Sequence, residues 1–205
     1  MTDNEHPIGG GRDRAIDDGS PHVHGGWWGL LAHRWPAALG IVVAALTVYG
    51  LEDGRDLAAL VVLMALVYVG SAALDRRRFA WVVLLAGVAV LAVVPSTSQV
   101  VASEVFLVAA LVFVVLGVVR GQLREPGGLT LQAAGMLVFG AGMLAALYVA
   151  PETGAYLVAA GLLGHGAWDA VHYVRDGVVA RSYAEFCAVL DLLVGAAVLL
   201  VLFVG

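Results

Sequence analysis

The chain contains no lysine, because all eleven of its basic residues are arginine. Lysine is the side chain that forms Schiff bases and that contacts the phosphates in a phosphate-binding loop. A retinal cofactor and a nucleotide held by such a loop are therefore both excluded. Cysteine is almost as scarce: Cys187 is the only one, so the chain cannot form an internal disulfide.

Charge is also scarce, since only 13% of the 205 residues are charged while 61% are hydrophobic. A soluble domain of this length needs far more polar surface to cover its core. Apolar runs of about 17–25 residues, the length that crosses a bilayer as a helix, recur along the chain. The runs lack the alternation of polar and apolar residues typical of membrane barrels. The composition therefore predicts an all-α integral membrane protein with the lipid bilayer as its surroundings.

We predict seven transmembrane helices in a domain covering residues 27–205. Proline can start a helix or stop one, and Pro36, Pro95, Pro126 and Pro151 fall at the predicted helix ends. Before this domain, residues 1–26 are rich in Gly, Asp, His, Pro and Ser, which predicts a disordered tail. The seven spans cover residues 36–51, 57–74, 79–94, 102–119, 129–149, 155–174 and 184–204.

The arginines alternate with these spans. Ten of the eleven fall in the tail or in loops that lie on the tail's side of the membrane, and only Arg55 falls on the other side. Basic residues accumulate on the cytoplasmic side of membrane proteins. We therefore predict a cytoplasmic-membrane protein with its N-terminus in the cytoplasm and its C-terminus outside, and a count of six or eight spans would spoil the pattern.

A short internal similarity hints at a repeat. The stretch "GSAALD" at residues 70–75 matches "GHGAWD" at residues 164–169 in three of six positions. The two spans that contain these stretches run in the same direction. This is what a 3+1+3 arrangement of parallel repeats requires, and parallel repeats occur in several transporters.

Ionisable side chains interrupt the sixth span. His165, Asp169 and His172 lie within about 60° of one another around a helix of 3.6 residues per turn. They therefore form one polar stripe, which we expect to begin near the cytoplasmic surface and to descend into the membrane.

The seventh span carries a matching stripe of Tyr183, Cys187 and Asp191, which recur every four residues. A loop of about ten residues joins the two spans, and spans joined in this way are usually neighbours. In an antiparallel hairpin the residues at equal depth have a nearly constant sum of numbers. We therefore expect three pairs: His172 with Tyr183, Asp169 with Cys187, and His165 with Asp191.

Three kinds of function can use these stripes. First, histidine exchanges a proton near physiological pH, so a cytoplasm-facing ladder of His and Asp suits small-solute or proton-coupled transport. Second, the stripe residues are ligands that zinc or another divalent metal accepts, which leaves open an intramembrane metal-dependent hydrolase. Third, the stripes can clamp helices together in a structural or interaction protein. The candidate metal ligands are His165, Asp169, His172 and Asp191, with the Cys187 thiolate as a further donor.

We favour transport over the other two. An interhelical polar pair contributes only about 0.6 kcal/mol to the stability of a membrane protein, so stabilisation alone does not explain two polar stripes. Ionisable groups inside a membrane usually mark a functional site. The chain departs from seven-helix zinc hydrolases of the ceramidase type, because Ser71 is followed four residues on by Asp75 rather than by histidine. Whether the protein is an enzyme stays open, and no basic patch suggests a nucleic-acid partner. A water-filled cavity at His165 would favour transport or catalysis, and a dry contact with Asp191 would favour the clamp.

Overall fold

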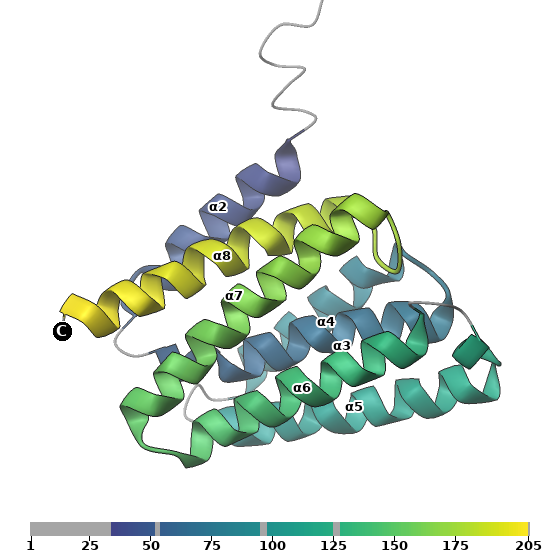
Figure 1. Cartoon of the computed structure of the whole chain (residues 1–205), viewed down its shortest axis with the longest axis horizontal. Coiled ribbons are helices and arrows are strands. Elements are labelled where there is room, and N and C mark those ends of the chain that lie inside the picture. Colours follow the sequence, from purple (N-terminus) through teal and green to yellow (C-terminus); the bar gives the residue numbers. More distant parts are fainter. Residues whose placement is uncertain (1–33, 52–53, 95–97, 125–127, 205) are drawn as a thin grey trace, which may run out of the picture. The chain divides into compact units, whose positions relative to one another are not determined.

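In the part of the chain that the structure describes, the fold consists of seven α-helices and two short 3-10 helices, η1 and η3 (Figure 1). The computed structural model describes residues 34–51, 54–94, 98–124 and 128–204, and within these ranges it contains no strand. The predicted tail lies outside the described residues. The elements are α2 (Trp35–Val48), η1 (Gly54–Leu57), α3 (Ala58–Leu74), α4 (Phe79–Val93), α5 (Gln99–Val119), η3 (Gln122–Arg124), α6 (Leu129–Tyr148), α7 (Pro151–Arg175) and α8 (Arg181–Val204).

The helix ends follow from the local sequence. Pro151 occupies the first turn of α7, where its missing N–H costs no hydrogen bond. Helices α3 and α7 both end at an aspartate in the left-handed region, Asp75 with φ 52° and Asp176 with φ 47°. Aspartate tolerates this conformation better than most residues with a Cβ atom. The chain can therefore turn sharply after α3 and after α7.

The all-α class and the seven helices agree with the sequence prediction. The largest differences are at the starts of α5, α7 and α8, which begin three or four residues earlier than expected, and at the end of α2, which ends three residues earlier than expected. At α5 the reason is visible: the Gln99 side-chain oxygen accepts a hydrogen bond from the Ala59 backbone N–H at 3.2 Å. A polar residue that sequence reasoning assigned to a loop is thus used to join two helices.

Four helices are long and apolar enough to cross a membrane. They are the continuous η1–α3 segment Gly54–Leu74, then α5, α6 and α8. By contrast, α2 and α4 have 14 and 15 residues, about 21–23 Å at 1.5 Å per residue, whereas the hydrocarbon core is about 30 Å thick.

Helix α3 is the core of the fold. It packs against α4, α5, α6 and α7, and 83% of the most apolar 18-residue stretch of the η1–α3 segment is buried. The corresponding 18-residue stretches of α5, α6 and α8 are only 28–39% buried. These helices therefore expose large apolar side chains such as Leu111, Leu137 and Leu200. Contiguous apolar surface of this kind is rare on soluble proteins and is normal against lipid.

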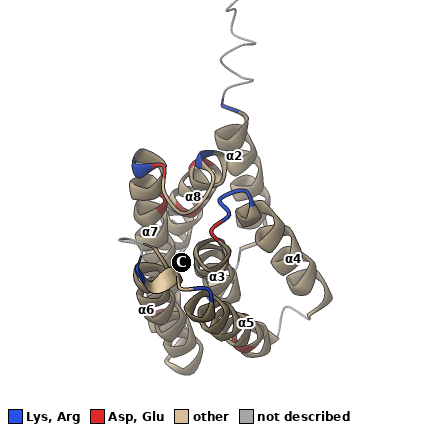
Figure 2. Cartoon of the chain, turned by 90° about the vertical axis from the view of Figure 1, so that its right-hand side faces the viewer, with Lys and Arg blue, Asp and Glu red and all other residues tan. Residues whose placement is uncertain are grey.

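Most of the described arginines gather at one end of the helices. Figure 2 looks onto this end, where blue segments mark the α3–α4 turn and the adjacent ends of other helices. Arg55 lies near Gly154 at the start of α7, since a Cβ atom built on that glycine would come within 3.2 Å of the Arg55 Cδ atom. The start of α7 is opposite its arginine-bearing end, so Arg55 lies at the other end of the helices from most of the described arginines.

Candidate functional site

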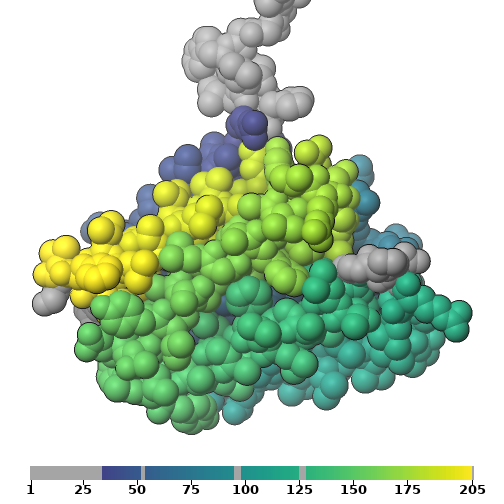
Figure 3. Space-filling view, viewed as in Figure 1, coloured from purple at the N-terminus to yellow at the C-terminus, as the bar shows by residue number. Residues whose placement is uncertain are grey.

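The polar stripe of α7 faces the inside of the bundle. His165 and Asp169 are completely buried and His172 is 6% exposed. Helix α7 lies between α8 and α6 on the face shown in Figure 3. The 3.6-residue periodicity therefore places all three side chains where the sequence analysis expected them, on one face.

Small residues allow α8 to approach this face closely. A Cβ atom built on Gly166 would lie 3.3 Å from the Asp191 Cβ atom and 2.9 Å from the Leu192 Cγ atom. Gly195 has the same role farther along, against Leu162 and Leu163. The glycines of α7 and α8 thus bring Asp191 next to the polar stripe.

Three ionisable side chains meet at the centre of the bundle, and we call them the His–Asp centre: His165, Asp169 and Asp191. The His165 Nδ1 atom lies 2.8 Å from an Asp191 carboxylate oxygen and 3.0 Å from an Asp169 carboxylate oxygen. All three side chains are at most 1% exposed. One imidazole nitrogen therefore serves two carboxyl groups, and the expected neighbours His165 and Asp191 are in direct contact.

Tyr68 completes the centre from the core helix α3. Its hydroxyl donates a hydrogen bond to the second oxygen of Asp169 at 2.5 Å. Its ring lies edge-on to His165, with ring centres 5.7 Å apart. Sequence reasoning missed Tyr68. The available signal was a tyrosine in the middle of the 57–74 span, far from the membrane interface where tyrosine is usually found.

His172 belongs to a separate hydrogen-bonded group. Its Nδ1 atom lies 2.9 Å from the Trp168 backbone oxygen and its Nε2 atom 3.1 Å from the Gln132 side-chain nitrogen. A backbone carbonyl can only accept, so Nδ1 carries the proton and Nε2 accepts from the Gln132 amide. Both nitrogens of a neutral imidazole are thereby satisfied, and His172 does not join the His–Asp centre.

The other two expected pairs are not hydrogen-bonded. Tyr183 and Cys187 are completely buried on the inner face of α8, as the stripe required. The Tyr183 ring packs edge-on against Tyr68 and Trp81, at centre distances of 6.0 and 5.8 Å. Within the described residues no hydrogen bond links Tyr183 to His172 or Cys187 to Asp169, so the predicted ladder has one polar rung, His165 with Asp191.

A void that touches the His–Asp centre is too narrow for a water molecule. It lies between α3, α6 and α7 and is lined by residues that include Tyr68, Gln132, Phe139 and His165. The His165 Nε2 atom and one Asp191 oxygen have no hydrogen-bond partner among the described residues. A direct contact between His165 and Asp191 beside a void too narrow for water is the result expected of a helix clamp. Buried polar atoms are normally paired, however, so a clamp alone does not account for the two unpaired atoms.

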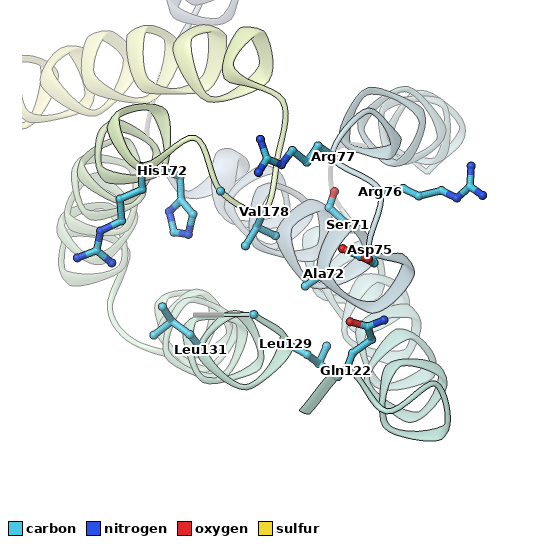
Figure 4. Close-up of a pocket in the computed structure, with 13 residues that line it drawn as sticks. Ser71, Ala72, Asp75, Arg76, Arg77, Gln122, Leu129, Leu131, His172 and Val178 are labelled. Carbon is cyan, nitrogen blue, oxygen red and sulfur yellow. The ribbon is translucent and has the colours of Figure 1, made fainter. Parts of the chain in front are cut away.

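A wider cavity opens at the arginine-rich end of the helices (Figure 4). We call this cavity of about 390 Å³ the vestibule. The His172 ring points into it from α7, and the buried Ser71 side chain lines it from α3. The Tyr68 ring lies 4.8 Å, centre to centre, from His172 and carries the hydroxyl that reaches Asp169. His172 and Tyr68 therefore separate the vestibule from the His–Asp centre.

The donor set of the His–Asp centre also suits a metal ion. One histidine nitrogen and two carboxylate oxygens lie within 4.8 Å of one another. Zinc accepts histidine nitrogen and carboxylate oxygen as ligands. His172, which the sequence analysis included among the ligands, lies outside this group because Trp168 and Gln132 occupy its nitrogens.

No family model, no curated protein and no solved structure matches the chain. The fold and the site therefore define the molecule only as a helical protein with apolar helices of membrane-spanning length and a buried His/Asp group.

Proposed function

We propose that the protein is a seven-span transporter of the cytoplasmic membrane and that it couples a small solute to proton movement through the His–Asp centre. Seven spans require the short helices α2 and α4 to cross with their flanking residues, and α7 to cross with its polar face turned inward. The clustering of arginines at one end supports this arrangement, because basic residues accumulate on the cytoplasmic side of membrane proteins. The vestibule would then open to the cytoplasm. A 3+1+3 repeat, which would relate α3 to α7, stays a prediction.

One observation carries the proposal: two buried carboxyl groups share one imidazole nitrogen. With both carboxylates ionised, the centre has a net charge of −1 even when His165 is protonated. A net charge is costly in an apolar surrounding unless it is balanced. The centre therefore favours binding one further cation, and the smallest candidate is a proton.

A carrier in its closed state would also have a void too narrow for water beside His165. A carrier opens its central site to one side of the membrane at a time, and substrate sites lie near the bilayer midplane. Here His172 lines the vestibule, and Tyr68 lies between His172 and Asp169. A shift of α7 against α3 would separate these rings and connect the centre to the cytoplasm.

Proton movement can be tested in vesicles that contain the purified full chain and a trapped pH dye, under an imposed membrane potential. We expect proton entry faster than in protein-free vesicles, and we expect Asp191→Asn to abolish this excess because it removes one of the two carboxylates. Glu185→Gln is the matched control, since Glu185 lies on the same helix but pairs with exposed Arg34 at 3.0 Å. Equal flux in Asp191→Asn and the parent would contradict the proposal.

Orientation is a separate prediction that rests on the arginine distribution. Reporter domains fused to the two termini should show the N-terminus in the cytoplasm and the C-terminus outside, because an odd number of spans separates them. Protease protection of the same fusions in oriented vesicles provides an independent readout. Finding both termini on one side would overturn the count of seven spans.

Metal binding is the second candidate function, because the donor set fits a divalent ion. Bound zinc would supply a Lewis acid, but hydrolysis also requires a water molecule and a substrate at the centre. The void beside His165 admits neither. The geometry thus favours an ion that is held or carried by the helices over an intramembrane hydrolase.

A further inference from the structure

An apolar groove lies on the outside of the bundle between α4 and α5, far along the chain from the His–Asp centre. It has a volume of about 240 Å³ and is lined only by apolar side chains, including Val82, Ala86 and Ala109. Its floor is α3, where a Cβ atom on Gly70 would meet both Val83 and Phe113 at 3.3 Å. This glycine therefore lets groove-lining side chains of α4 and α5 settle onto the core helix.

The groove continues into a basic hollow at the cytoplasmic end proposed above. This hollow, of about 370 Å³, is lined by the three consecutive arginines 76–78 together with Phe79 and Val82. Phe79 and Val82 line the apolar groove as well. The two spaces therefore adjoin each other, one cationic and the other apolar.

Two of the three arginines are available for a ligand. Arg77 pairs with Asp176 at 3.4 Å. Arg76 and Arg78 are exposed, and neither forms an ion pair within the described residues. Arg76 also lines the vestibule, but Figure 4 shows its side chain extending away from the centre of that cavity.

We propose that this groove binds one anionic phospholipid, with its phosphate on Arg76 and Arg78 and an acyl chain between α4 and α5. The length fits: the lining of α4 runs from Phe79 to Val90, which is about 16 Å of helix, close to half of a hydrocarbon core about 30 Å thick. The charge fits as well, because basic pockets between helices on the cytoplasmic side bind anionic headgroups. A zwitterionic lipid would fill the groove but would gain less from the arginines.

The test places a fluorescent reporter in the groove of the full chain. Val82→Trp suits this purpose because Val82 is 54% exposed and lines both spaces. The protein is reconstituted in phosphatidylcholine bilayers in which a minor fraction of the lipid, either phosphatidylglycerol or phosphatidylcholine, carries brominated acyl chains. Quenching of the new tryptophan, taken as the difference from the parent protein, then reports which lipid occupies the groove.

We expect brominated phosphatidylglycerol to quench more strongly, with a preference of roughly fivefold for each participating arginine. Arg76→Gln with Arg78→Gln should reduce the preference to near one. Arg120→Gln with Arg124→Gln is the matched control, since it removes the same charge from exposed arginines that do not line the groove. This control should keep the preference.

Three results would overturn the assignment: equal quenching by the two lipids, a preference that survives the Arg76 and Arg78 substitutions, or quenching that disappears as the protein dimerises. Ala86→Trp is a second reporter in the same groove if Val82→Trp does not fold. Filling the groove with Ala86→Leu and Ala109→Leu should reduce quenching of the Val82→Trp reporter by both lipids, whereas Ala141→Leu on α6 should not. The outcome is independent of proton flux, because none of these residues belongs to the His–Asp centre.

Discussion

Replacing His165 with alanine should destabilise the protein by about 3–5 kcal/mol, the cost of breaking a buried charged group from one side. The substitution leaves Asp169 and Asp191 facing each other without the imidazole that now lies between them at 3.0 and 2.8 Å. Adding Asp191→Ala should restore part of the stability, because it removes one of the two opposed carboxylates. The double variant should therefore lose less than the sum of the single variants, by more than about 0.5 kcal/mol.

Unfolding of the purified protein by a denaturing detergent measures these differences. The matched cycle uses Arg34→Ala and Glu185→Ala, which break an ion pair with a similar distance, 3.0 Å, but with a 66% exposed arginine side chain. An exposed pair contributes about 0–1 kcal/mol, so its coupling should be small. Additive effects of His165→Ala and Asp191→Ala would mean that the two groups do not interact in the protein. This result would also contradict the proposed function, which depends on their contact.

The helices were predictable from the sequence because hydrophobicity and proline position dictate them directly. Continuous apolar runs give helices in lipid, and the predicted ends of α3, α4 and α6 lie within about one residue of the observed ends. The early start of α5 was not predictable from composition, because it depends on the contact between Gln99 and the backbone of another helix. Such a contact exists only after the helices have packed.

The candidate site was predictable only within one hairpin. The 3.6-residue period and the short loop place His165 beside Asp191, because both are local properties of neighbouring helices. Tyr68 and Gln132 come from α3 and α6, and which helices border α7 is decided by side-chain packing. The same packing separates His172 from the His–Asp centre, since Gln132 and the Trp168 carbonyl satisfy its two nitrogens.

This separation sharpens the choice between a proton and a metal ion as the occupant of the centre. If a divalent ion is the occupant, the purified protein should carry close to one equivalent of metal. Binding of the ion should require His165, Asp169 and Asp191, because the ligand atoms of these three side chains lie within 4.8 Å of one another. Binding should not require His172, which lies outside this group. His165→Gln should therefore empty the site, and His172→Gln should leave it occupied.

Elemental analysis of the purified full chain counts the metal, and thermal unfolding with and without a chelator gives a second readout. A ligand present at one hundred times its dissociation constant stabilises the folded state by about 2.7 kcal/mol, so removing zinc should lower the unfolding temperature of the parent and leave His165→Gln unchanged. A metal-free parent whose unfolding temperature does not respond to zinc or to chelator would contradict metal binding. In that case a proton is the occupant that we propose for the positive charge that balances two carboxylates on one imidazole. Asp191→Asn removes one of these carboxylates, so the centre should then be electrically balanced without any added cation.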